Sequence, residues 1–182
     1  MSVFTNPASR SQEQGRAYTE AILGLVADRD PLSVLRETPV LLSSAVAGLD
    51  ESQLSAPEAA GKWSIRHVMR HLADSEFVWA WRMRLVLSQD RPTLLTGYDQ
   101  DLWAQRLHYE RAPVAESLDE FAVTRRSNLR LLTAASEADL ARVGVHAERV
   151  DESVAHMLRL YAGHDLLHLR QIARIRETVT TR

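Results

Sequence analysis

The segment from Asp151 to Thr178 constrains the fold most strongly, because its apolar residues recur at spacings of three and four with no intervening proline. This period is typical of one long amphipathic helix. The apolar positions are Val154, Met157, Leu158, Tyr161, Ile172 and Ile175. His164 and His168 lie among them, four residues apart, so their imidazoles point the same way about one turn apart. Two histidines on a buried face need either hydrogen-bond partners or a metal ion.

The rest of the chain predicts further helices and no persistent strand. Only 7 of the 182 residues are glycine and 6 are proline, which favours long helices over a turn-rich β fold. Asp30-Pro31 and Ser64 are typical helix starts. The expected helices span residues 12–27, 31–47, 64–88 and 113–135 (or 117–135), with a short piece at 98–107 and the last at 151–178. Four long helices with one long crossover predict an all-α four-helix bundle, with the helix at 12–27 as an extra N-terminal element. Residues 1–10 are expected to be a flexible N-terminus and residues 11–182 a single domain.

Composition excludes several kinds of function. The chain has no cysteine, which excludes disulfides, zinc–thiolate sites, Fe–S clusters and a cysteine nucleophile. A net charge of −2 without a basic stripe argues against nucleic-acid binding. The sequence shows no secretory signal and no apolar run long enough for a membrane span, so a cytoplasmic protein is expected.

The helix that starts at Ser64 carries two candidates for a third metal ligand, His67 and His71. At about 100° per residue, His71 falls about 110° from the centre of the apolar stripe and His67 about 150° from it. His71 is therefore expected at the core boundary, and a bundle can bring it opposite His164 and His168. Three imidazoles plus water would suit Zn²⁺, Ni²⁺ or a related divalent ion. The alternative stays open, because two histidines at this spacing are more often unrelated polar residues than a metal site.

Other residues are weaker candidates. Asp165 could accept a hydrogen bond that fixes an imidazole tautomer. Glu76 lies near the stripe centre and could act as a general base or support the site, or could simply pair with Arg66 or Arg82. Three aromatic side chains and one loop histidine could line a substrate pocket, although the aromatic residues are equally compatible with a plain core. These four pocket candidates are Trp63, Trp79, His146 and Tyr161.

Three segments resemble the signatures of the DinB/YfiT-like superfamily. Residues 61–76 (GKWSIRHVMRHLADSE) resemble its second-helix signature, and residues 98–103 (YDQDLW) resemble its following connection. Residues 162–172 (AGHDLLHLRQI) resemble its last-helix signature. The resemblance covers roughly residues 30–176. One departure is that relatives often carry a histidine followed by Glu-Arg-Gly, whereas here His146-Ala-Glu-Arg is followed by Val150-Asp151.

The resemblance implies a bundle of up-down-down-up order and a divalent metal held by His71, His164 and His168. It also implies an enzyme, since relatives include S-transferases that use bacillithiol, mycothiol or glutathione, a maleylpyruvate isomerase and metal-dependent hydrolases. We therefore expect a metal that activates a low-molecular-weight thiol or water against a small electrophile. The alternatives are a metal-dependent hydrolase and a non-catalytic bundle that binds a metal or ligand. Many relatives form homodimers, so a homodimer is also expected.

Overall fold

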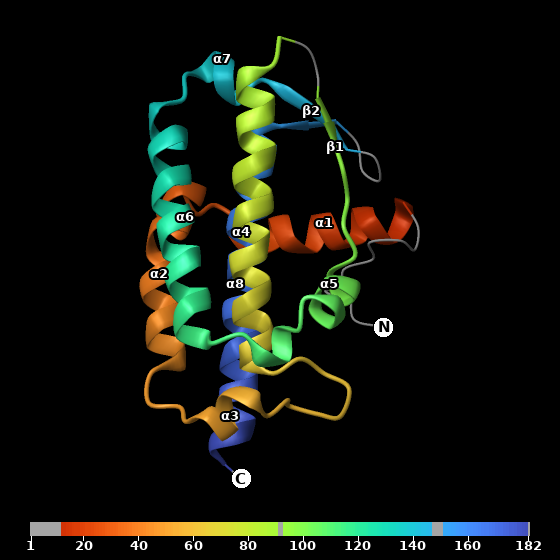
Figure 1. Ribbon diagram of the computed structural model, residues 1–182. Helices are drawn as coiled ribbons and strands as arrows, with labels where there is room; N and C mark the ends of the chain where they lie inside the picture. Colours follow the sequence, from red (N-terminus) through yellow and green to blue (C-terminus); the bar gives the residue numbers. More distant parts are fainter. Residues whose placement is uncertain (1–11, 91–92, 147–150, 182) are drawn as a thin grey trace.

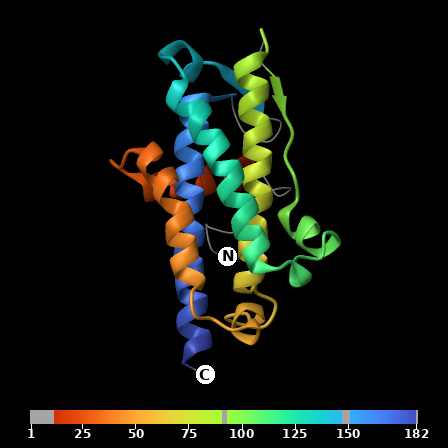
Figure 2. The same ribbon diagram turned by 60° about the vertical axis from the view of Figure 1, so that its left-hand side comes forward.

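The computed structural model describes residues 12–90, 93–146 and 151–181, and four long helices form a bundle (Figure 1). These are α2 (Pro31–Val46), α4 (Ile65–Ser88), α6 (Val114–Ala134) and α8 (Val154–Thr180). α2 and α8 run in one direction and α4 and α6 in the other (Figures 1 and 2). The up-down-down-up bundle expected from the sequence is confirmed. The expected flexible segment at residues 1–10 lies outside the described residues.

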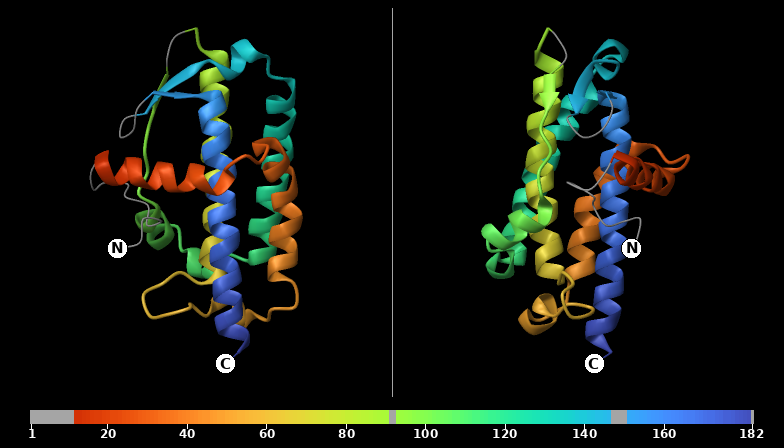
Figure 3. Two further views of the ribbon diagram at one scale, coloured as in Figure 1. Left: turned by 180° about the vertical axis from the view of Figure 1, so that it is seen from behind. Right: turned by 90° about the vertical axis from the view of Figure 1, so that its right-hand side faces the viewer.

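The extra N-terminal helix, α1 (Gln12–Val26), runs across α8 instead of along the bundle (Figure 3). The two helices approach closely at Gly163, where a Cβ atom would lie only 2.3 Å from the backbone oxygen of Ile22. Any larger residue at this position would push α1 away. Because Gly163 directly precedes His164, the crossing also fixes the surroundings of one candidate metal ligand.

Local capping explains where two of the long helices, α2 and α4, begin. The Asp30 side chain accepts hydrogen bonds from the backbone amides of Leu32 and Ser33, with Pro31 in the first turn of α2. Ser64 caps α4 by accepting from the amide of His67. The connections contain the short helices α3 (Glu51–Ser55), α5 (Gln100–Arg106) and α7 (Glu137–Leu140) and the 3₁₀ helix η1 (Tyr109–Arg111). Only α5 was expected, as the short helical piece at 98–107.

A small sheet joins two connections at one end of the bundle. β1 (Thr93–Leu95) pairs in parallel with β2 (Val143–His146), and β2 pairs antiparallel with β3 (Asp151–Ser153). The sequence predicts no strands, because strands of three or four residues are too short to show a period of two. As a result, the last helix begins at Val154 instead of Asp151.

A polar layer across the middle of the bundle divides the apolar core in two. On α4, the apolar cluster at the α3 end stops at Ala73, and the cluster at the sheet end starts at Trp79. On α8, the last fully buried residue of the sheet-end cluster is Ala162, and the first of the other cluster is Ile172, with only partly buried leucines packed between them. The polar side chains at this level of the bundle are all buried or half-buried: His71, Ser75, Glu76, Arg125, Asn128, His164, Asp165 and His168. None of the helices in the described ranges has the length and hydropathy of a membrane span.

Candidate metal centre

Three histidines of the polar layer meet at one point. The Nε2 atom of His164 lies 3.1 Å from Nε2 of His71 and 3.1 Å from Nε2 of His168. One ligand atom from each of the three residues lies within 4.8 Å of the others. α4 supplies His71, while α8 supplies the other two from successive turns. The structure therefore brings together the three residues that the sequence analysis selected.

His67 lies outside this cluster. Its Nδ1 atom is 2.8 Å from Oγ of Ser64, the residue that caps α4, so the ring is held at the start of the helix. Burial lowers the pKa of His67. The spacing along the helix predicted that His71 faces the core and that His67 faces outward, and the structure places His71 in the cluster and His67 outside it.

The environment keeps the three imidazoles neutral. Burial lowers the pKa of each ring, and for His71 and His164 the neighbouring histidines lower it further. The pKa of His168 is lowered to about 4, even though its bond to Gln171 opposes the shift. Oε1 of Gln171 accepts from Nδ1–H of His168 at 2.8 Å, which leaves Nε2 of that ring as a lone-pair donor. Metal binding requires this neutral form.

The arrangement is compatible with a bound divalent ion. Three nitrogen atoms bound tetrahedrally to zinc at about 2.0–2.1 Å would lie about 3.4 Å apart. Two of the three Nε2 pairs here are 3.1 Å apart, and all the ligand atoms lie within 4.8 Å of one another. Without an ion, three lone pairs would face one another if His71 and His164 carry their protons on Nδ1, as His168 does. The Nδ1 atoms of His71 and His164 have no hydrogen-bond partner in the described part of the chain. The donor set is therefore compatible with a metal bound through three Nε2 atoms.

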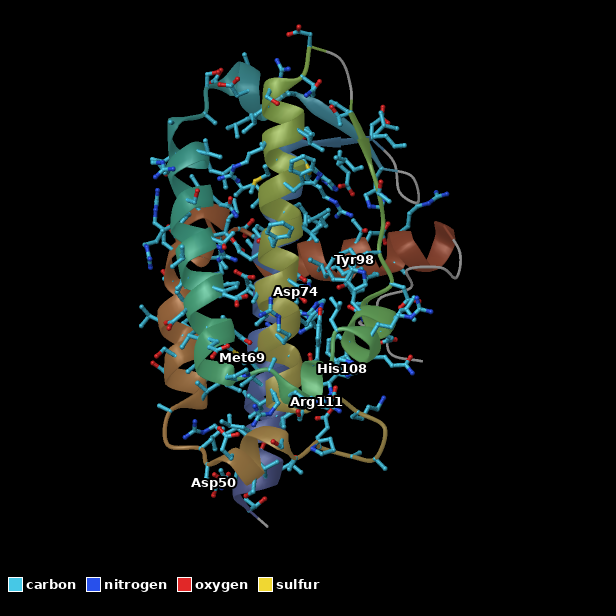
Figure 4. All side chains as sticks on the ribbon, in the orientation of Figure 1. Asp50, Met69, Asp74, Tyr98, His108 and Arg111 are labelled. Atoms are coloured by element: carbon cyan, nitrogen blue, oxygen red, sulfur yellow. The ribbon has the colours of Figure 1, made fainter. Side chains whose placement is uncertain are left out.

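The fourth side of the cluster holds hydroxyl and aromatic groups. Oγ of Ser75 lies 3.4 Å from Nε2 of His71 and 2.9 Å from the hydroxyl of Tyr98. Tyr98 lies on the connection between β1 and α5, beside α4 (Figure 4). The ring of Trp63, a predicted pocket residue, lies 5.1 Å from that of His71. Ser75 and Tyr98 were not among the sequence candidates, although residues 98–103 belong to one of the three segments of family resemblance.

Glu76 lies in the polar layer and is completely buried. Its carboxylate accepts hydrogen bonds from Arg125, from Asn128 and from the hydroxyl of Tyr161. The suggested pairing with Arg66 or Arg82 is wrong, because the ion-pair partner is Arg125. With so many donors, the Glu76 carboxylate joins helices together and is poorly placed to act as a general base.

Asp165 is bound to the same guanidinium. Its Oδ2 accepts from Arg125 at 2.7 Å, whereas its Oδ1 has no partner among the described residues. The hydrogen bonds of the described residues include none from an imidazole to Asp165, so its expected role of fixing a histidine tautomer falls instead to Gln171. Burial opposes the charge on Arg125, but attraction to Asp165 and Glu76 outweighs it and raises the pKa of Arg125 well above its ordinary value.

The remaining pocket candidates lie in the sheet-end apolar cluster and on β2. The rings of Trp79 and Tyr161 stack 4.5 Å apart within the sheet-end apolar cluster, where they serve as core. His146 is buried on β2 and is not part of the three-histidine group. The segment that follows it, where the sequence departs from the family pattern, lies outside the described residues.

The chain is similar to known proteins in sequence and in fold. Residues 35–172 match the sequence model of the DinB superfamily. A protein of Bacillus mycoides named "putative metal-dependent hydrolase" is 30% identical over 143 residues, covering 79% of this chain and 82% of its own. A protein of the same name from Oceanobacillus iheyensis is 29% identical over 141 residues, covering 78% and 81%.

A solved structure is similar as well. YfiT from Bacillus subtilis is described as "a probable metal-dependent hydrolase with an unusual four-helix bundle topology". It matches with a TM-score of 0.75 and 27% sequence identity, over 81% of this chain and 84% of its own. Sequence and fold thus point to the same group of proteins.

Proposed function

The chain belongs to the DinB superfamily, and on that premise we propose that it is a metal-dependent enzyme acting on a small molecule. In this proposal His71, His164 and His168 hold a divalent ion, with Zn²⁺ or Ni²⁺ as the ions that suit three imidazoles best. The observation that carries the proposal is the convergence of three neutral Nε2 atoms at one point.

The number of ligands supports catalysis over a structural role. Within the described residues, the cluster contains no fourth histidine, aspartate or glutamate. Structural zinc sites are normally closed by four protein ligands, whereas catalytic sites keep one position open. A divalent ion in such a site lowers the pKa of a bound water or thiol and so supplies a nucleophile at neutral pH. The chain's own contribution is to hold the three rings neutral and fixed, with Gln171 orienting His168.

Hydrolysis is the reaction class that the names of the relatives favour. Transfer of a low-molecular-weight thiol to an electrophile is the second candidate. It is favoured by the donor set, because three neutral imidazoles leave the charge of a divalent ion uncompensated and so attract an anionic ligand such as a thiolate.

One experiment separates these reactions. The apo protein is reloaded with zinc or nickel and incubated with a panel of esters and amides, or with electrophiles and a cellular thiol. Acid release would support hydrolysis, and metal-dependent thiol consumption would support transfer. His67→Ala serves as the matched control for His168→Ala, because His67 lies on α4 outside the cluster. Equal rates in wild type and His168→Ala would contradict the proposal.

A structural metal role makes a different prediction. Chelation would then lower the melting temperature strongly, and the loaded protein would bind no exogenous ligand at the metal and catalyse neither reaction. The catalytic proposal requires ligand binding at the open position, whatever the effect of chelation on stability.

We also propose that two copies pair through the outer face of α4 and α6. Phe77 and Trp81 occupy positions i and i+4 of α4 and are 68% and 60% exposed, and Val123 of α6 is 56% exposed. Ion pairing of Arg70 with Glu120 places these parts of α4 and α6 side by side. Exposed aromatic residues of this size favour association. Light scattering should report a dimer that Phe77→Ser with Trp81→Ser converts to a monomer, and a monomeric wild type would refute it.

A further inference from the structure

The fourth side of the histidine cluster carries a pair of hydroxyl groups from two separate elements. Ser75 comes from α4, one turn after His71, and is buried. Tyr98 comes from the connection between β1 and α5 and is half-buried. Their hydroxyl oxygens lie 2.9 Å apart, a good hydrogen-bonding distance.

The direction of the Ser75 hydroxyl is unusual for a helix interior. A serine within a helix commonly bonds the carbonyl of its own helix four residues earlier. Here the hydrogen bonds recorded for Ser75 among the described residues go to Nε2 of His71, at 3.4 Å, and to Tyr98. Because that Nε2 atom is also 3.1 Å from Nε2 of His164, the Ser75 hydroxyl lies beside the point where the histidines converge.

Tyr98 is held in place from the outside. Its ring lies 4.5 Å from that of Trp103, which comes from α5. Asp99 caps α5 by accepting from the amides of Asp101 and Leu102, so the residue that follows Tyr98 has a fixed backbone position. The half-buried phenol therefore connects the buried serine to the protein surface, with its hydroxyl at the inner end.

We propose that Ser75 and Tyr98 position the small ligand that shares the metal, with Tyr98 donating to Ser75 and Ser75 donating to that ligand. This inference rests on the proposed function and deepens it. Once the lone pair of His71 Nε2 is taken by an ion, the Ser75 hydroxyl loses that acceptor and needs another. The chemistry selects ligands whose metal-binding atom also accepts a hydrogen bond, such as an oxygen anion or a thiolate. Tyr98 acts through Ser75 and is a positioning residue.

The test uses the cobalt-loaded protein, with azide as the anionic probe followed by visible absorption. Cobalt stoichiometry should be the same in wild type, Ser75→Ala and Tyr98→Phe. Loss of one hydrogen bond should raise the azide Kd about three- to tenfold in Ser75→Ala and by a smaller factor in Tyr98→Phe. The double variant should bind azide no more weakly than Ser75→Ala alone, since Tyr98 acts through Ser75.

Tyr109→Phe is the matched control, because its hydroxyl donates to Asp74, and the hydrogen bonds of the described residues include none from it to a cluster histidine. It should leave the azide Kd unchanged. The inference is overturned if Ser75→Ala and Tyr98→Phe bind azide as wild type does, or if Tyr109→Phe weakens azide as much as Tyr98→Phe. A wild type that takes up no cobalt would instead contradict the proposed function, so the two failures differ.

Discussion

Arg125 is predicted to stabilise the bundle more than any exposed arginine. Its side chain is completely buried on α6. The guanidinium donates to both oxygens of Glu76 on α4, to Oδ2 of Asp165 on α8 and to the backbone oxygen of Leu35 on α2. One arginine therefore joins all four long helices, and Arg125→Met removes every one of these bonds while keeping most of the apolar volume.

The size of the effect follows from the two carboxylates left behind. Removing one partner from a buried ion pair typically costs about 3–5 kcal/mol, because the remaining charge is buried without compensation. Such a loss is a large part of a typical folding free energy of about 5–15 kcal/mol. For a chain of this size, it corresponds to a fall in melting temperature of about 6–20 °C.

Urea unfolding of the metal-free protein, followed by circular dichroism, measures this loss without a contribution from metal binding. Arg29→Met is the matched control, because Arg29 and Glu37 form an ion pair whose side chains are 48% and 56% exposed. Its expected cost is at most about 1 kcal/mol. Combining Arg125→Met with Glu76→Gln should cost less than the sum of the two single changes, since the second removes a charge that the first leaves unpaired. A cost below about 1 kcal/mol for Arg125→Met, or additivity within about 0.5 kcal/mol, would refute the reasoning.

Three further predictions concern the α1 crossing and the histidine cluster. Gly163→Ala should destabilise the protein by about 1–3 kcal/mol in denaturant unfolding, since its Cβ would meet the backbone oxygen of Ile22. Gly24→Ala, where nothing lies within 4 Å, should be neutral or stabilising, and equal effects would contradict the close approach. Gln171→Leu removes the acceptor of His168 Nδ1–H and should weaken metal binding about 10- to 100-fold by competition with a chelator, whereas unchanged affinity would exclude its orienting role. The pKa of His168 is about 4 in the folded protein and about 6.5 when unfolded, so the unfolded state binds more protons between these values. Stability of the metal-free protein should therefore fall as pH drops from about 6.5 towards 4, and a flat urea midpoint across that range would contradict burial of neutral rings.

Local chemistry made much of the fold predictable. Caps at Asp30 and Ser64 depend on side chains within three residues of the amides they bind, so the starts of α2 and α4 follow directly from the sequence. The spacing of the apolar residues along α4 also predicted that His71 points towards the core. These are interactions within one helix, which a period of 3.6 residues describes well.

Long-range pairing accounts for what the sequence analysis missed. β1 pairs with β2 across about 50 residues of chain, and strands of three or four residues carry too little pattern to reveal it. Arg125 was missed because an arginine in a helix usually marks a solvent-facing position. Its place among the apolar positions of α6 was the available signal, but its partners lie 49 and 40 residues away. The Ser75–Tyr98 pair likewise forms only after the connection folds back onto α4.

The central claim is that His71, His164 and His168 bind one divalent ion. Equilibrium dialysis against zinc or nickel, with metal analysis of each variant, tests it most directly. Wild type and His67→Ala should each bind one ion per chain, and alanine at any of the three cluster positions should lower the affinity at least about 100-fold. Full metal binding by any one of the three cluster variants, or loss of binding in His67→Ala, would contradict it.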